Sequence, residues 1–355
     1  MNAAKLTLLL LGLMLAACSA SKPMGEASAS VTLMTFNAQN LFDNIDDPVK
    51  DDKAYLPLAA KQNDAHRSAC AEIRNRYWRA ECLDLDWSDE AVNHKLGVLA
   101  EVIRQVNGGR GADVIALQEI ENKYILERLR NEYLADLGYQ ESILIEGTDN
   151  RGIDVAFLSR LPLVAAPKLH PLKIRTHQDR ARDTRGVLEA RFVLPDGSKM
   201  TGYSVHFPAP FHPTEMRIAA YRHLQSLRAT LPDDEVVFAA GDFNTTSTED
   251  AREKLLDTYV RPDWQVAHDY CEGCPGTYYY APDNNWSFLD TIIVSSGSTG
   301  TWQLQSDSVT IPRGIPAQNT TEVTTEVSPA RYDSATRQGA SDHWPLVVTL
   351  STKAP

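Results

Sequence analysis

The sequence predicts one α/β domain in which two β-sheets pack between outer helices. Apolar segments of strand length alternate with segments of helical spacing, without an internal repeat or an interdomain linker. The 355 residues, 43% hydrophobic and 23% charged, suffice to bury a large core. The formal net charge of -12 is unlike the basic surface of proteins that hold nucleic acid tightly, although a bound metal ion can supply positive charge locally.

The individual elements follow from the spacing of apolar residues. Leu96, Leu99 and Ile103 recur three or four positions apart, which predicts a helix, and Gly108 follows where that helix should end. The segment DVIAL at 113–117 is typical of a short buried strand. In chain order, the predicted strands are 31–37, 113–117, 153–158, 188–193, 202–206, 236–240, 288–294 and 346–350, and the predicted helices are 91–107, 124–137 and 215–230.

Two stretches do not follow this alternation. Residues 44–88 separate the first strand from its helix, and so long a connection is uncommon unless it is functional or separately stabilised. The second stretch, 295–339, is rich in Ser and Thr. The arginines of the first stretch could meet a polyanion, or they could form a solvated face balanced by nearby acidic residues; they are Arg67, Arg74, Arg76 and Arg79.

The N-terminus is expected to be a targeting segment. Residues 1–17 combine Lys5 with an apolar run too short to span a bilayer comfortably, and their Leu-Ala-Ala ending before Cys18 resembles a bacterial lipobox. We therefore expect a lipoprotein signal peptide, lipidation of Cys18 and a flexible tether over 18–30. Ser19 favours the outer membrane, facing the periplasm or the cell surface. The alternative is an ordinary secretory signal with a chance Cys.

Export would place the four remaining cysteines in an oxidising compartment. Their short separations favour disulfides between Cys70 and Cys82 and between Cys271 and Cys274. The second spacing also suits a redox or zinc pair, but we find no convincing set of further zinc ligands at matching spacing.

Six apolar segments end in residues that can bind a metal ion or a phosphate. Because ligands of α/β sheets gather at strand ends, we expect these residues to converge on one cleft. Taken singly, an Asp or Asn after a strand is more often a turn or cap residue. Glu119 is different, since a carboxylate after the apolar IALQ needs a partner such as a hard cation. The candidate residues are Asn37, Glu119, His206, Asp242, Asn244, Asp290, Asp342 and His343.

The motifs and their order resemble the endonuclease/exonuclease/phosphatase superfamily, which includes deoxyribonucleases, abasic-site endonucleases, inositol polyphosphate phosphatases and bacterial sphingomyelinases. The segments that carry the resemblance are TFNAQNLFD, ALQEIEN, RGIDVAFLSR, YSVHF, AAGDFN, FLDTIIVS and GASDHWPL. The resemblance implies a four-layer α/β/β/α sandwich over 31–351, with 44–88 as an insertion and the site at one edge of the paired sheets.

The resemblance also implies roles for the candidate residues. It implies a divalent cation, usually Mg²⁺ with Mn²⁺ or Ca²⁺ as alternatives, on a metal side formed by Asn37, Glu119 and Asp342. The implied catalytic residues are His206, Asp242, Asn244, Asp290 and His343, and the implied substrate-binding residues are Arg185, Asn244 and His206. The implied orienting carboxylates are Asp290 behind His343 and Asp154 behind His206. Two histidines beside carboxylates should both have raised pKa values.

The predicted function is metal-dependent hydrolysis of phosphoester bonds by a nuclease-like phosphodiesterase, expected to be a monomer acting on DNA or RNA. The alternative is a sphingomyelinase-like phospholipid hydrolase, or a phosphoesterase of inositol phosphates or other small molecules, because this superfamily uses nearly the same core residues for all of them. A non-catalytic binding module is disfavoured, since every implied catalytic position is filled.

Overall fold

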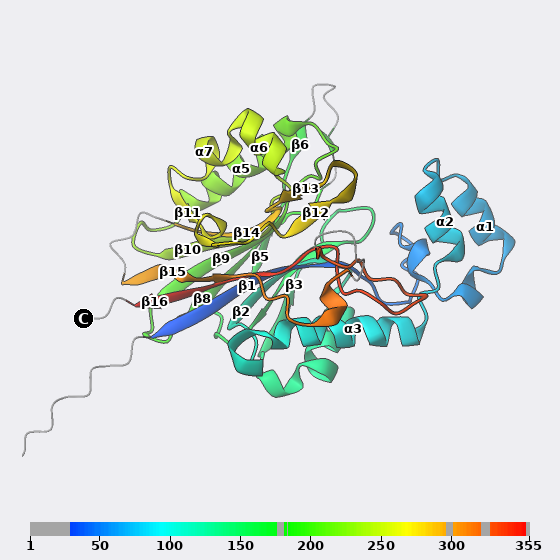
Figure 1. The fold of residues 1–355 in the computed structure, drawn as a ribbon, viewed down its shortest axis with the longest axis horizontal. Coiled ribbons are helices and arrows are strands. Elements are labelled where there is room, and N and C mark those ends of the chain that lie inside the picture. Colours follow the sequence, from blue (N-terminus) through cyan, green and yellow to red (C-terminus); the bar gives the residue numbers. More distant parts are fainter. Residues whose placement is uncertain (1–28, 176–180, 183, 296–300, 321–326, 353–355) are drawn as a thin grey trace, which may run out of the picture.

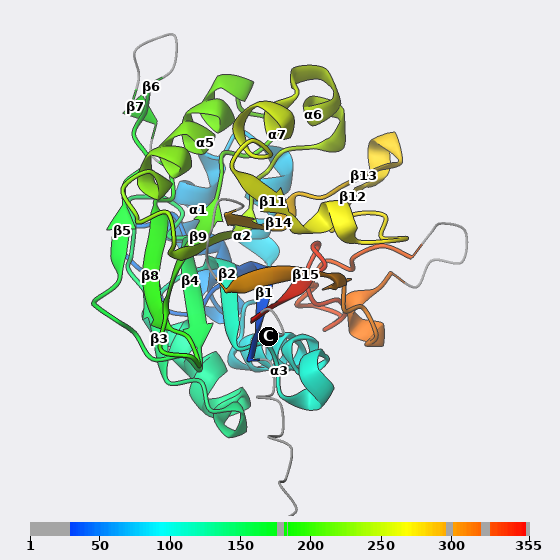
Figure 2. The same cartoon turned by 90° about the vertical axis from the view of Figure 1, so that its left-hand side faces the viewer.

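The computed structural model describes residues 29–175, 181–182, 184–295, 301–320 and 327–352. The predicted signal peptide, Cys18 and most of the predicted tether lie outside the described residues. The described part has four layers, with helices outside two six-stranded sheets, as predicted (Figure 1, Figure 2). No helix within it has the length and apolar character needed to span a bilayer.

The first sheet is built around β1, which pairs in parallel with β2 and antiparallel with β16. Its strands, in spatial order, are β15 (Trp302–Thr310), β16 (Leu346–Thr352), β1 (Ser30–Leu41), β2 (Val114–Ile120), β4 (Asp154–Ser159) and β3 (Glu141–Leu144). The second sheet is built around β10, which pairs in parallel with β9 and antiparallel with β14. Its strands, in spatial order, are β11 (Trp264–Val266), β14 (Asp290–Ser295), β10 (Val236–Asp242), β9 (Lys199–His206), β8 (Val187–Val193) and β5 (Lys168–His170).

Alternating side chains divide the apolar interior into three cores. In β1, Val31 and Leu33 pack between the two sheets, whereas Met34 and Phe36 point to the other face and pack under the outer helices. Tyr221 belongs to the third core, on the outer face of the second sheet. The helices over the first sheet are α3 (Asp89–Arg104) and α4 (Lys123–Arg128), and those on the side of the second sheet are α5 (Thr214–Arg228), α6 (Ser247–Glu253) and α7 (Leu255–Tyr259).

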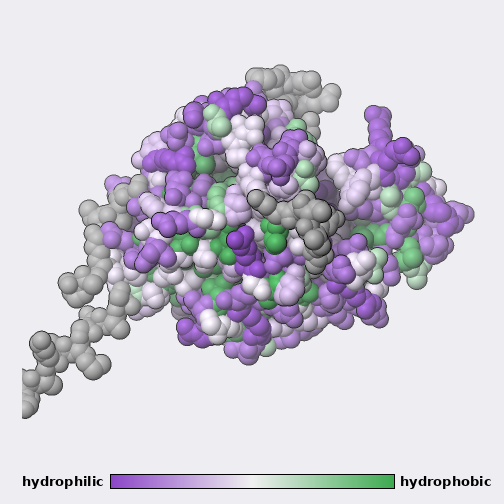
Figure 3. All heavy atoms as spheres, in the orientation of Figure 1, coloured by the Kyte–Doolittle hydropathy of each residue, from purple (hydrophilic) through white to green (hydrophobic). Residues whose placement is uncertain are grey.

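The insertion folds as a small helical unit at the end of the sandwich opposite the start of β1 (Figure 1). It contains α1 (Asp64–Ala71) and α2 (Arg76–Asp84), and it forms a largely hydrophilic lobe in Figure 3. The sulfur atoms of Cys70 and Cys82 lie 2.00 Å apart and join the two helices. Those of Cys271 and Cys274 lie 1.96 Å apart, so both predicted pairs are at disulfide distance.

The buried Lys61 ties the insertion together. Its Nζ donates to the carbonyl oxygens of Ala54 at 2.8 Å and Leu85 at 2.7 Å, and a third bond reaches Glu81 at 3.3 Å. These bonds fix the carboxyl end of α2 against the turns that precede α1. The insertion is therefore an ordered wall rather than a loose connection.

The spacing of apolar residues did not predict the strands and helical turns that are short or lie at sheet edges. The predicted helix 124–137 begins as α4 but continues as a π-helical turn over Leu129–Tyr133 and a 3-10 turn over Ala135–Leu137. β15 lies in the Ser/Thr-rich stretch, where half-exposed polar side chains conceal the strand period. Strands of two or three residues show no period at all; besides β5 and β11 they are β6 (Ile174–Arg175), β7 (Ala181–Arg182), β12 (Tyr278–Tyr280) and β13 (Asn285–Ser287).

Candidate active site

The pairing of strands brings the candidate residues to one edge of the sandwich. β1 and β2 run in parallel, so Asn37 and Glu119 leave the first sheet together near their carboxyl ends. In the second sheet, Asp242 of β10 pairs with His206 of β9 on one side and with Asp290 of β14 on the other. The convergence expected from the strand ends is therefore present.

These strand ends open into one cleft of about 1050 Å³. Two predicted residues, Asn37 and Asp290, lie buried behind its wall and bond to side chains that line it. The predicted residues that line the cleft are Glu119, Arg185, His206, Asp242, Asn244, Asp342 and His343.

Left-handed backbone conformations gather at this site. Glu119 has φ 61°, Asn40 has φ 54° and Asn244 has φ 52°. Such conformations are uncommon in residues other than Gly and cost roughly 1–3 kcal/mol each. Glu119 lies where the pairing of β2 is interrupted, and one carboxylate oxygen accepts the Asn40 amide at 2.8 Å. The fold thus holds the Glu119 side chain in place at the cost of local strain.

Asn37 links two carboxylates. Its Nδ2 donates to Glu119 Oε1 at 3.4 Å and to Asp242 Oδ2 at 3.2 Å, and its Oδ1 accepts the Gln39 amide at 2.9 Å. With the oxygen engaged in this way, Asn37 orients the carboxylates through its amide group. The Asn37 carbonyl oxygen keeps a second lone pair, so the place of Asn37 among the metal-side residues stays a prediction.

His343 forms a buried pair with Asp290. The distance from His343 Nδ1 to Asp290 Oδ2 is 2.6 Å, and the Asp290 amide donates to Thr277 Oγ1 at 3.0 Å. Burial opposes a charge on the ring, but the Asp290 carboxylate outweighs it and raises the pKa of His343 to about 10. The His343 ring is therefore an imidazolium at neutral pH, as predicted.

Asp242 and Asn244 form a rigid turn after β10. Asp242 Oδ1 accepts the Asn244 amide at 2.8 Å, and Asn244 Nδ2 donates to the Phe207 carbonyl at 2.9 Å. Burial, together with the charge of Asp290, raises the pKa of Asp242. A carboxylate with a raised pKa is a stronger base than an ordinary Asp, which suits it to accept a proton from water.

The sequence predicts a raised pKa for His206, and the structure indicates the opposite. Its Nε2 lies 3.5 Å from Asp242 Oδ2 and 3.9 Å from Glu119 Oε1. Burial nevertheless lowers the pKa of His206 well below its usual value, and the nearby Arg185 and Arg151 lower it further. The prediction of a raised pKa was wrong for His206, because desolvation and arginine charges oppose the carboxylates.

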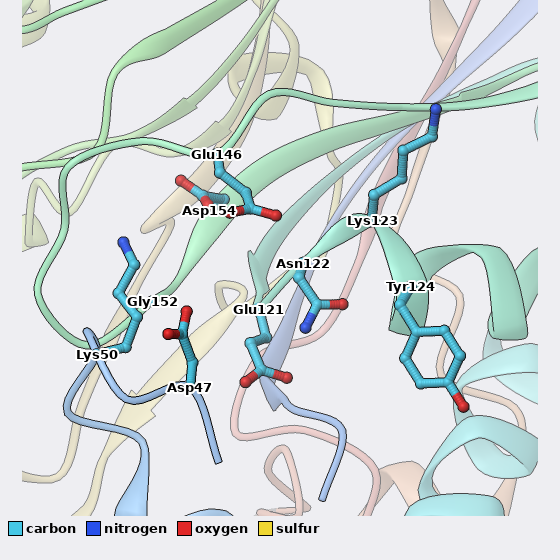
Figure 4. A pocket seen from close by; sticks show the side chains of 9 residues that line it. All are labelled: Asp47, Lys50, Glu121, Asn122, Lys123, Tyr124, Glu146, Gly152 and Asp154. Carbon is cyan, nitrogen blue, oxygen red and sulfur yellow. The ribbon is translucent and has the colours of Figure 1, made fainter. Parts of the chain in front are cut away.

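Asp154 does not orient His206. The Asp154 Oδ1 atom accepts the Gly147 amide at 2.9 Å, and the residue lines a separate pocket of about 190 Å³ with Glu121 and Lys50 (Figure 4). Burial raises the pKa of Asp154 to about 7. His206 Nδ1 is buried and has no hydrogen-bond partner among the described residues. The predicted role of Asp154 is therefore wrong, since β4 directs its side chain into this other pocket.

Arg185 does lie beside the reacting centre. Its Nη1 donates to Asp149 Oδ2 at 3.2 Å and its Nη2 to the Phe207 carbonyl at 3.1 Å. Only 11% of the Arg185 side chain is exposed, so the guanidinium is fixed at the cleft wall. Its partner Asp149 lies in the loop between β3 and β4 and carries no motif, so the sequence did not predict this pair.

Asp342 forms an ion pair with Arg331, a residue that the sequence did not predict at the site. Arg331 Nη1 donates to Asp342 Oδ2 at 2.8 Å, and both residues line the cleft. Among the described residues, one group of three possible metal ligands lies at the cleft and its wall, Asp242, Asp290 and His343, with ligand atoms within 4.8 Å of one another; it includes neither Glu119 nor Asp342. Arg331 engages one oxygen of Asp342, and the place of Asp342 on the metal side stays a prediction.

The insertion supplies one wall of the cleft, but not through its arginines. Tyr55, Tyr77, Trp78 and Glu81 line the cleft. The four arginines of the insertion are absent from the described lining; Arg67, for example, pairs with Asp64 on the exposed face of α1. Between the two alternatives for these arginines, the structure supports the solvated face.

The donor set at the centre fits a hard cation. Glu119 and Asp242 present carboxylate oxygens to the same space, with side chains 17% and 3% exposed. Two carboxylates that accept from the same Asn37 amide group repel one another unless a cation or a proton intervenes. Oxygen donors suit Mg²⁺, Mn²⁺ or Ca²⁺ and suit zinc poorly.

Comparison with known proteins identifies the fold and the family. Among curated proteins, none matches the sequence. Many solved structures share the fold, and three of them illustrate the low identity. An endonuclease/exonuclease/phosphatase family protein from Bacteroides thetaiotaomicron is 15% identical, with a TM-score of 0.54 over 92% of this chain and 99% of its own. A humanized TDP2 from D. rerio is 14% identical, with a TM-score of 0.54 over 91% and 99%. A mannosyl-6-phosphatase from Bacteroides thetaiotaomicron is 14% identical, with a TM-score of 0.51 over 90% and 99%.

At these identities the structural likeness establishes the fold alone, so membership rests on the sequence. The sequence model described as the Endonuclease/Exonuclease/phosphatase family matches residues 34–343, a span that begins before Asn37 and ends at His343. The chain therefore belongs to the endonuclease/exonuclease/phosphatase family.

Proposed function

We propose that the protein is a metal-dependent phosphodiesterase whose substrate is a nucleic acid. The main observation in favour of a hydrolase is the arrangement of charged side chains across the cleft. A protonated His343, held by Asp290, faces two carboxylates, Glu119 and Asp242, that together can hold a cation and a water molecule. Family membership supports phosphoester chemistry at such a centre.

Hydrolysis of a phosphodiester requires a water molecule in line with the leaving oxygen and neutralisation of charge on the phosphoryl oxygens. Asp242 accepts the proton of the water, which Asn244 holds in place. His343 donates to a phosphoryl oxygen. His206 is uncharged, so it contacts the leaving-group side as a hydrogen-bonding ring rather than as a strong acid. A divalent cation held by Glu119 would supply Lewis-acid stabilisation of the developing charge.

The aromatic rim of the cleft supports a nucleic acid as substrate. Tyr77 and Trp78 on α2, Phe211 after β9 and Tyr280 at the end of β12 all line the cleft with exposed rings, and Phe211 is 77% exposed. Exposed rings beside a phosphate site are suited to stacking on bases, which stabilises single strands without sequence preference. A small sugar phosphate would not need several exposed rings around so large a cleft.

The proposed membrane anchor would be joined to the start of β1. The described chain begins near Ser30, at the end of β1 opposite the insertion (Figure 1). The strand from Ser30 to Asn37 rises by about 23 Å. A lipid on Cys18 would thus be joined, through the expected flexible tether, to the end of the molecule farther from the cleft.

The function is tested with the protein purified without residues 1–29, supplied with Mg²⁺, Mn²⁺ or Ca²⁺. We expect hydrolysis of single-stranded DNA or RNA, and no turnover in excess EDTA. Hydrolysis of sphingomyelin vesicles or inositol phosphates, with both nucleic acids left intact, would overturn the proposed substrate. Full activity in EDTA would overturn the metal requirement.

We also propose that the protein is exported and lipid-anchored in the bacterial cell envelope, because Leu-Ala-Ala precedes Cys18. Cys18→Ser should block lipoprotein processing and move the protein from the membrane fraction to the soluble fraction or leave its precursor uncleaved. Mass spectrometry of the mature N-terminus checks this. An unmodified N-terminal residue downstream of position 18 in the wild-type protein would contradict lipidation.

A further inference from the structure

Arg331 is a charged group at the cleft that the mechanism above does not use. Its Nη1 donates to Asp342 Oδ2 at 2.8 Å, and its Nη2 lies 3.9 Å from Glu81 Oε1 on α2 of the insertion. The Arg331 side chain is 45% exposed and lines the same cleft as Glu119 and His343. One edge of the guanidinium is thus engaged by carboxylates, while nearly half of the side chain remains open to the cleft.

The backbone around Arg331 is fixed on both sides. The Tyr332 amide donates to Gln39 Oε1 at 2.7 Å, and the Tyr332 hydroxyl donates to a carbonyl of α3 at 2.7 Å. On the other side, the Ala340 amide donates to the Ala330 carbonyl at 2.9 Å. Gln39 follows Asn37 by two residues, so the anchor of Arg331 is part of the site itself. This guanidinium is presented by a preorganised loop and not by a mobile surface chain.

We propose that Arg331 is a substrate-binding residue, which contacts the phosphate of the substrate directly and occupies the place of a second cation beside Asp342. The site then binds one divalent cation, on the Glu119 side. This inference rests on the proposed phosphodiesterase function, since it assigns the second positive charge of the same cleft.

The chemistry of the guanidinium explains why an Arg suits this position. Its planar group offers five donors, so it can hold the Asp342 carboxylate along one edge and a phosphate oxygen along another. Without Arg331, the Asp342 carboxylate would stand free at the cleft and repel an anionic substrate. A Lys would provide a charge without the two-sided geometry.

The test uses Arg331→Ala and Arg331→Lys, with Arg67→Ala as a matched control that removes an exposed, ion-paired Arg outside the cleft. We measure the affinity of the metal-loaded protein for inorganic phosphate by calorimetry, the stoichiometry of Mn²⁺, and KM and kcat on the best substrate. Thermal melting confirms that each variant is folded.

We expect one Mn²⁺ per wild-type chain. Arg331→Ala should weaken phosphate binding and raise KM by roughly 10- to 100-fold, as expected for loss of a charged hydrogen bond. Arg331→Lys should restore only part of this affinity, and Arg67→Ala should leave it unchanged. Asp342→Asn should retain the wild-type Mn²⁺ affinity, because Asp342 binds Arg331 and not the cation.

The inference is overturned if Arg331→Ala keeps the wild-type phosphate affinity and KM, or if the wild-type chain binds two Mn²⁺ and loses one in Asp342→Asn. A different result would refute the proposed function without refuting the role of Arg331. A wild-type protein that cleaves no phosphoester, yet binds phosphate in an Arg331-dependent way, would support the binding role of Arg331 and refute the hydrolase.

Discussion

His343→Ala is expected to lower turnover by roughly two to four decades while metal affinity stays unchanged. The ring is the only part of the His343–Asp290 pair that reaches the cleft, and Asp290 keeps it protonated from a distance of 2.6 Å. Its removal deletes a charged donor to the phosphate but leaves Glu119 and Asp242 in place. The measurements are kcat on the best phosphoester and Mg²⁺ affinity by calorimetry.

Asp290→Asn tests the charge of the His343 ring, because it keeps the ring and removes the carboxylate that holds it protonated. The pKa of His343 is raised to about 10, so activity that needs the imidazolium should persist through neutral pH and decline only as the pH approaches 10. Without the Asp290 carboxylate that pKa falls, and the alkaline limb of the pH–rate profile should move to lower pH, with a milder loss of turnover than in His343→Ala. Near-wild-type turnover in His343→Ala would refute the assignment.

The position of the site could be predicted from the sequence because it depends on local pattern. Apolar segments of strand length fix where each strand ends, and parallel pairing of β1 with β2 and of β9 with β10 brings those ends to one edge. Glu119, Asp242 and His343 were therefore found from their place after apolar segments and from the family motifs. The charge of His343 also followed, because Asp290 dominates its surroundings.

The misassigned residues depended on contacts between distant segments. Asp154 begins β4 beside the other residues, yet it points into a different pocket, which spacing along the chain does not reveal. The charge of His206 follows from burial and from two arginines, and these come from the loop before β4 and the segment before β8. Arg331 carries no motif, and only the folded loop brings it to Asp342. The exposed rings of Tyr77 and Trp78 line the cleft only because α2 packs against it in the fold.

Glu119→Gln is expected to weaken metal binding and depress turnover together. The substitution keeps the shape of the side chain and removes the negative charge that a hard cation requires. Lewis-acid stabilisation is worth several kcal/mol, so its loss should lower kcat by roughly a hundred- to a thousand-fold. Mg²⁺ affinity by calorimetry and kcat at saturating Mg²⁺ measure the two effects, and excess metal should recover part of the activity.

Glu121→Gln is the matched control for this substitution. Glu121 lies two residues along the same chain segment, but it accepts the Asp43 amide at 2.7 Å and lines the smaller pocket (Figure 4). Burial, with the charge of Asp43, raises the pKa of Glu121 to about 8, and the side chain is not part of the lining of the cleft that Glu119 lines. Metal affinity should therefore survive in Glu121→Gln and fall in Glu119→Gln. Equal metal affinity and full activity in both variants would refute the assignment of the cation to Glu119.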